Sequence, residues 1–137
     1  MTETVVIFAS KFGCTKNAAQ YIADRLDADI FNLKIQSVID LSRFKRVLIG
    51  TGIYAGKPSK VVVEFVEQNK GQLDGRKVGL FMCCSKDDES GDEQCKNVSA
   101  MLGIENAVFF ANQRKKIKDR DSPKLNEYIE KLENDLF

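Results

Sequence analysis

A six-residue turn near the start of the chain, SKFGCT, carries residues suited to binding an anion. It follows the apolar run VVIFA and precedes a helical pattern. The start of a helix offers unpaired N–H groups and a partial positive charge, and Ser10 and Thr15 add a hydroxyl at each end of the turn. Gly13 lets the backbone approach a ligand closely. The turn predicts a phosphate site, and the same hydroxyls also suit an ordinary helix cap.

A second turn, GTGIYAGKPS, follows another apolar run and matches a nucleotide-binding P-loop only in part. Thr51 stands where that motif has its first glycine, and Pro58 stands where it needs a magnesium-binding hydroxyl. Nucleoside triphosphatase activity is therefore not expected. Tyr54 lies between Gly52 and Gly56, so its ring could stack on a flat ligand or pack against its neighbours.

A third turn, CCSKDDESGDEQC, is the most acidic stretch of the chain. Its carboxylates suit a helix start and solvent, or a docking surface for a basic redox partner. Their spacing does not match a calcium-binding EF-hand loop. The acidic residues are Asp87, Asp88, Glu89, Asp92 and Glu93.

The composition narrows the class of protein. Of 137 residues, 43% are hydrophobic, which suffices for one domain, residues 1–137, with a buried core. The net charge of +1 gives no reason to expect a nucleic acid or an anionic membrane as partner. No apolar run could span a bilayer and the first residues do not resemble a secretory signal, so we expect a cytoplasmic protein.

The chain has four cysteines and no histidine. A metal site is therefore not expected, and Ser-His or Cys-His nucleophile pairs are excluded. We expect Cys83 to be buried and Cys84 to point toward the predicted site. Any chemistry is expected to come from a cofactor.

Five β-rich runs alternate with helical patterns. Apolar residues recur at helical spacing within residues 18–26, 62–66, 98–102 (with Met101 on the apolar face) and 125–132. The segment after the second run has room for only a short helix, and Ser122 with Pro123 predicts the start of the last helix. The predicted strands are Thr4–Ala9, Asp29–Leu33, Arg46–Gly50, Lys77–Cys84 and Asn106–Ala111.

Five strand–helix units predict an α/β three-layer sandwich. We expect a five-stranded parallel sheet in the order 2-1-3-4-5, with helices on both faces. In this order ligands bind beyond the carboxyl ends of the strands, near strands 1 and 3, where the three turns begin. A phospho-accepting receiver domain is not expected, because it would need acidic residues where this chain has Ala9–Ser10 and Gly50–Thr51. A dinucleotide-binding domain with an intact G-x-G-x-x-G motif is not expected either, because no such motif follows the first strand.

With these features, the chain resembles the flavodoxin family over nearly its whole length. Residues 10–15, S-x-x-G-x-T, are similar to the family's S/T-x-T-G-x-T loop for the phosphate of flavin mononucleotide (FMN). The resemblance implies a flavodoxin-like fold, FMN as cofactor, and electron transfer with redox partner proteins. Phe12 and Cys14 stand where the family usually has a hydroxyl and an asparagine.

The resemblance also implies which residues bind FMN. Residues 51–56 would pass one side of the isoalloxazine ring, with Tyr54 at the stacking position, and residues 84–87 would approach its pyrimidine edge. The implied cofactor-binding residues are Ser10, Lys11, Phe12, Gly13, Cys14, Thr15, Thr51, Gly52, Ile53, Tyr54, Ala55, Gly56, Cys84, Ser85, Lys86 and Asp87.

Residues 44–66 are in addition similar to part of the menaquinone-dependent protoporphyrinogen oxidases, a flavodoxin-like subgroup. This similarity implies an alternative, an FMN-dependent oxidoreductase acting on protoporphyrinogen or a quinone. The chain lacks the long insertion of that subgroup, and it has no aromatic residue between Phe81 and Phe109 to stack on the second flavin face. An electron carrier, such an enzyme and a flavin-free interaction domain are the three functions to be distinguished.

Overall fold

All five predicted β-rich runs form strands of one sheet. The computed structural model of the chain describes residues 3–10, 13–54, 57–84, 89–111 and 114–134. The five strands pair in parallel in the order β2-β1-β3-β5-β6, which is the predicted 2-1-3-4-5 counted along the chain. They are β1 (Thr4–Ala9), β2 (Asp29–Asn32), β3 (Arg46–Tyr54), β5 (Lys77–Cys84) and β6 (Ala107–Ala111).

A short strand outside the predicted runs, β4 (Lys57–Pro58), pairs antiparallel with the end of β3. Ile53 lies opposite Pro58, and Tyr54 lies opposite Lys57. Because this pairing supports its last residues, β3 continues to Tyr54, beyond the expected end at Gly50.

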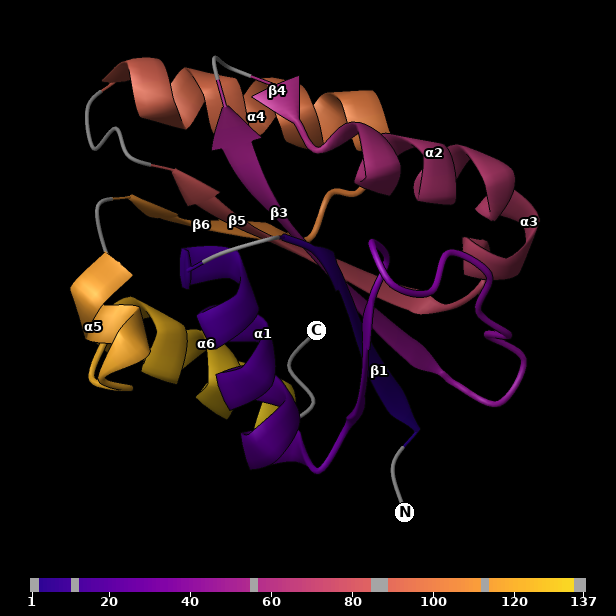
Figure 1. Ribbon diagram of the computed structural model, residues 1–137, viewed down its shortest axis with the longest axis horizontal. Helices are drawn as coiled ribbons and strands as arrows, with labels where there is room; N and C mark the ends of the chain where they lie inside the picture. The colour runs from indigo at the N-terminus through magenta and orange to yellow at the C-terminus, as the bar shows by residue number, and fades with distance from the viewer. Residues whose placement is uncertain (1–2, 11–12, 55–56, 85–88, 112–113, 135–137) are drawn as a thin grey trace.

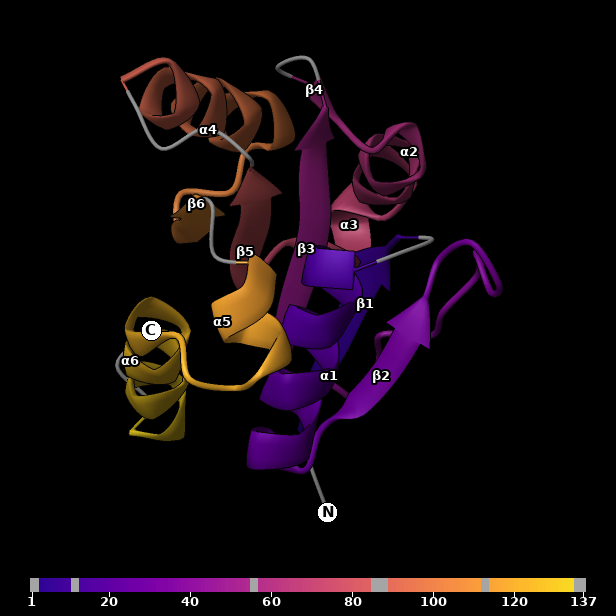
Figure 2. The ribbon, with the colours of Figure 1, turned by 60° about the vertical axis from the view of Figure 1, so that its left-hand side comes forward.

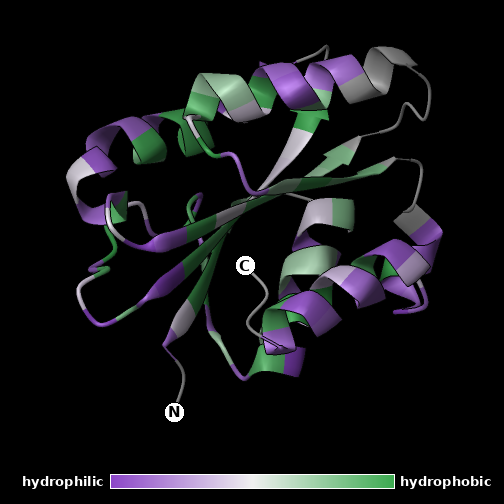
Figure 3. Cartoon of the chain, turned by 180° about the vertical axis from the view of Figure 1, so that it is seen from behind, coloured by the Kyte–Doolittle hydropathy of each residue, from purple (hydrophilic) through white to green (hydrophobic). Residues whose placement is uncertain are grey.

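Helices cover both faces of the sheet, as predicted (Figures 1 and 2). One face carries α1 (Gly13–Leu26), α5 (Arg114–Lys118) and α6 (Pro123–Glu133), and the other carries α2 (Lys60–Gln68), α3 (Lys70–Leu73) and α4 (Glu89–Leu102). In Figure 3 the strands are mostly hydrophobic, whereas the helices carry hydrophilic residues on their outer sides. Among the described residues, no helix has the length and apolar character needed to cross a membrane.

The central strands send alternate side chains to the two faces, as a pleated sheet requires. Val5 and Ile7 of β1 pack beneath α2 and α4, whereas Val6 and Phe8 pack beneath α1 and α6. On the second face, Gly50 of β3 lies between Phe8 of β1 and Phe81 of β5. The missing side chain leaves the space that the Phe81 ring fills.

The short helix expected after the second strand does not form. Residues 33–45 form turns and irregular chain. The Asn32 carboxamide oxygen accepts the N–H of Lys34, and an Asp40 carboxylate oxygen accepts the N–H of Ser42; such local bonds favour turns over helix. The segment still contributes to the core through Leu33, Ile39, Leu41 and Phe44.

The expectation that Met101 lies on the buried face of its helix is also wrong. Its side chain is 59% exposed, whereas Cys95, Val98 and Leu102 form the buried stripe of α4. On a helix these three positions fall within one narrow arc of the circumference, and Met101 lies outside that arc.

Candidate functional site

The three predicted ligand-binding turns leave the same edge of the sheet. Parallel pairing places Ala9 of β1 beside Thr51 of β3, and Gly52 of β3 beside Cys83 of β5. The strands therefore end next to one another, and the start of α1 lies at that edge (Figures 1 and 2). The strand ends at which the three turns begin therefore lie at one edge of the sheet, as the predicted strand order requires.

The first turn has the polarity of an anion site. Ser10 and Thr15 are buried, at 6% and 2% exposure, on either side of Gly13, the first residue of α1. Gly13 has a φ of +67°, in the left-handed region that favours glycine. The first turn of α1 has no acidic residue, so nothing in that turn opposes an anion. Lys11 and Phe12 lie outside the described residues.

Asn32, at the end of β2, supports this turn and is absent from the predicted site. Its side-chain nitrogen donates to the Ser10 carbonyl oxygen at 3.3 Å, while Leu33 N–H donates to the Phe8 carbonyl at 2.7 Å. The only signal in the sequence is an asparagine at the end of a strand, where such residues often form turns.

Thr51 lies below the second turn. It is fully buried, and its hydroxyl donates to the Gly52 carbonyl and accepts the N–H of Ser59, each at 2.9 Å. Ile53 is likewise part of the core beneath α2 and α4. These contacts give Thr51 and Ile53 a role in positioning the turn. Ala55, Gly56 and the side chain of Tyr54 lie outside what the structure describes.

The third turn begins at Cys84, the last residue of β5, whose partner on β6 is Ala111. Cys83 is buried, as expected. The side chain of Cys84 and residues Ser85, Lys86 and Asp87 lie outside the described residues. Of the predicted acidic cluster, the side chain of Glu93 is described, and it is exposed.

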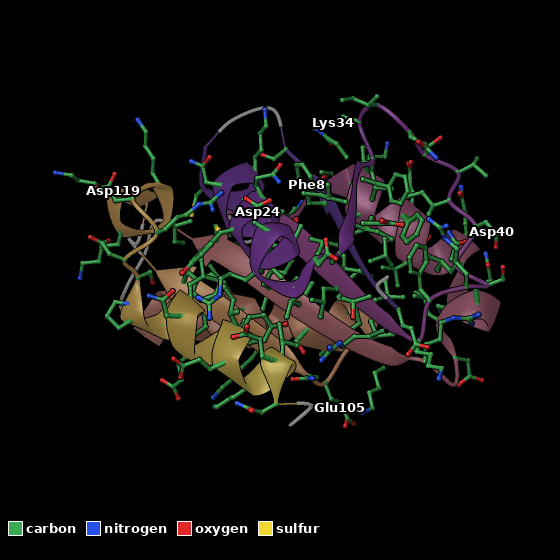
Figure 4. The ribbon with its side chains drawn as sticks, turned by 90° about the horizontal axis from the view of Figure 1, so that it is seen from below. Phe8, Asp24, Lys34, Asp40, Glu105 and Asp119 are labelled. Carbon is green, nitrogen blue, oxygen red and sulfur yellow. The ribbon has the colours of Figure 1, made fainter. Side chains whose placement is uncertain are left out.

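Behind the first turn, α1 is tied to the segment that follows α5. Arg120 binds Asp24 at 2.6 Å and lies over the ring of Tyr21, 5.0 Å from its centre. The hydrogen bond from Arg120 lowers the pKa of Asp24, with a smaller contribution from Gln20. Figure 4 shows Asp24 over α1 and Asp119 at the left beside α5, with Asp40 at the opposite side of the molecule.

Comparisons with known proteins agree with this geometry. A family model described as a flavodoxin domain matches residues 5–127. No curated protein matches the chain.

Several solved structures share the fold. A flavodoxin from Streptococcus pneumoniae TIGR4 is 17% identical, with a TM-score of 0.65, over 96% of this chain and 98% of that one. Oxidised flavodoxin 2 from Bacillus cereus is 17% identical, with a TM-score of 0.65, over 93% of this chain and 98% of that one. A flavoprotein from Lactobacillus acidophilus in complex with FMN is 16% identical, with a TM-score of 0.59, over 89% of this chain and 100% of that one. At these identities the likeness establishes the architecture.

Proposed function

The chain belongs to the flavodoxin family, and from that premise we propose that it binds FMN and carries electrons between redox partner proteins. The observation that carries the proposal is the first turn. This turn lies at the edge of the sheet where β1 and β3 end, and it leads into a helix whose first turn has no acidic residue. It contains a glycine with a positive φ and two buried residues with hydroxyl groups.

The phosphate of FMN fits this turn. The N–H groups at the start of α1 and the hydroxyls of Ser10 and Thr15 would hold it, and the helix dipole favours its negative charge. Asn32 would keep the turn in position through the Ser10 carbonyl. When bound, FMN supplies the redox chemistry, and the protein supplies binding, orientation and electrostatics.

We place the flavin ring between the second and third turns. Residues 51–56 would border one side, with Tyr54 as the stacking residue, and residues 84–87 would approach the pyrimidine edge through their backbone. The support is that Gly52 and Cys83 are neighbours across the sheet, so both turns begin side by side. The bonds of Thr51 and the β3–β4 pairing, which includes Tyr54, fix where the chain leaves the sheet after Tyr54.

The alternative, an oxidoreductase acting on protoporphyrinogen or a quinone, is not supported by the comparisons, and no feature of the described residues favours those substrates. A cytoplasmic location is part of the proposal and rests on the sequence alone. Turnover with a quinone in the absence of any partner protein would favour the enzyme.

The first experiment is to purify the protein, record its flavin absorbance and identify the released flavin by mass. Thr15→Val keeps the size of a buried side chain and removes its hydroxyl. We expect FMN to bind about tenfold more weakly, the cost of one hydrogen bond to a charged group. Thr15→Asp adds a negative charge and should abolish binding. Thr4→Val, at the other end of β1, is the matched control and should leave FMN affinity unchanged.

Circular dichroism separates loss of the fold from loss of the ligand. A folded, colourless wild-type protein that does not bind added FMN would contradict the proposal. Unchanged affinity in folded Thr15→Val would contradict the assignment of the phosphate to this turn.

A further inference from the structure

We propose that a basic surface beside the start of α1 docks an acidic redox protein. The surface, called here the α5 surface, consists of Lys16 of α1 and Lys115, Lys116 and Lys118 of α5. The inference rests on the proposed electron-transfer function and adds the chemistry of the partner.

The α5 surface is oriented by one buried residue. Ile117 is fully buried and belongs to the core that α1 and α6 also build. Because Ile117 points inward, the adjacent lysines of this short helix point outward, and all three are exposed. Lys16, in the first turn of α1, is exposed as well. Figures 1 and 2 both show α5 beside the start of α1.

The positive charge of this surface is not neutralised by described neighbours. None of its four lysines forms an ion pair with a described residue, whereas Asp24, the acidic residue of α1, is bound by Arg120. Asp119 and Asp121 follow the helix without pairing with its lysines. A chain with a net charge of only +1 thus concentrates positive charge here.

The position of the surface relates it to electron transfer. It borders the first turn, at the sheet edge where we place FMN. A partner bound there would have its redox group close to the flavin, and opposite charges would speed the encounter at low salt. The proposed partner is therefore a protein with an acidic surface.

The test uses an acidic iron–sulfur ferredoxin as the probe. Its binding to the purified protein is measured by isothermal titration at about 10 mM and about 150 mM salt, where screening lengths are about 30 Å and 8 Å. The variant Lys115→Glu/Lys116→Glu is compared with Lys70→Glu/Lys96→Glu, which changes the net charge equally on α3 and α4, on the other face of the sheet. Flavin content is recorded by absorbance for each protein.

We expect the α5 double variant to bind ferredoxin about tenfold more weakly at low salt, because charge reversal at a docking surface replaces attraction by repulsion. Its binding should also lose most of its salt dependence, while the α3/α4 variant stays within about twofold of wild type. The rate at which reduced ferredoxin passes one electron to bound FMN should follow the same order, with the cluster oxidised and the flavin reduced.

Equal effects of both double variants would overturn the proposal, since net charge alone would then explain them. Equally tight binding of duplex DNA or anionic vesicles would overturn it too. Ferredoxin binding can be measured without flavin, so the two proposals can fail separately. A folded protein that binds ferredoxin but does not bind added FMN refutes the proposed function, whereas a flavin-loaded protein that does not bind ferredoxin refutes only the docking surface.

Discussion

The packing of Phe81 against Gly50 predicts a large loss of stability in Gly50→Ala. An added Cβ at residue 50 would lie 2.3 Å from two carbons of the Phe81 ring, whereas ordinary contacts begin at 3.4 Å. The backbone of Gly50 is outside the left-handed region, so the ring alone makes alanine unfavourable.

The loss of stability should be large because the residues around Gly50 have little room to shift. Phe81 is fully buried, and β3 is held between β1 and β5 along its length. Overpacking of a core costs about 1–3 kcal/mol, and for this rigid position we expect about 3 kcal/mol. For a chain of this length that corresponds to a fall in Tm of about 12 °C.

Urea and thermal unfolding, followed by circular dichroism, measure this loss. Gly71→Ala is the control, because Gly71 is an exposed residue of α3 with no neighbouring atom within 4 Å of its added Cβ, so stability should not fall. Gly50→Ala/Phe81→Leu should be more stable than the sum of its single changes predicts, since the smaller side chain relieves the contact. A Gly50→Ala protein that melts within about 2 °C of wild type, or strictly additive effects in the double variant, would refute the reasoning.

Three further predictions concern single polar groups. Thr51→Val leaves the Ser59 N–H without its acceptor and should cost about 1–3 kcal/mol in urea unfolding, whereas Thr51→Ser, which keeps the hydroxyl, should cost clearly less. Ser122→Ala removes the cap that accepts the N–H of Leu125 and should cost about 1 kcal/mol, while Ser59→Ala, at a helix start where the side chain makes no capping bond, should cost little. Arg120→Asn suits the positive φ of residue 120 and removes the bond that lowers the pKa of Asp24. Because that pKa is lowered in the folded state, the pair stabilises the protein above about pH 4 and loses its effect as pH falls through the lowered pKa, so the small Tm difference from wild type should shrink as the pH is lowered below about 4.

The sheet could be predicted because its strands are short apolar runs buried on both faces. The predicted ends of β1 and β5 match the structure, and β3 is longer only because a two-residue strand pairs with its end. That pairing depends on residues meeting across a turn, which leaves no periodic signal. The helix after β2 is absent because backbone N–H groups donate instead to the side-chain oxygens of Asn32 and Asp40, and these local bonds compete with helix formation.

The sequence predicted that the three turns begin at one edge of the sheet, but it did not predict the contacts that support them. The buried hydroxyl residues and Gly13 follow from a recognisable motif. The bond from Asn32 to Ser10 and the bond between Thr51 and Ser59 join residues far apart in sequence or across a turn, and single residue types do not reveal them. The lysines of α5 are visible in the sequence, but their place beside α1 depends on the burial of Ile117.

The joining of the two ends of the chain in one core has a consequence for synthesis. Ala18 and Ile22 of α1 are covered by Ile117 of α5 and by Ile129 of α6. A ribosome adding about 5–20 residues per second therefore releases α1 roughly 5–20 seconds before α6 exists to cover it. During that interval β1, β2 and β3 can already pair while the apolar stripe of α1 faces solvent. The nascent chain therefore exposes this stripe for a period set by translation speed, and slowing translation between the codons for α1 and α6 should lengthen its exposure to aggregation.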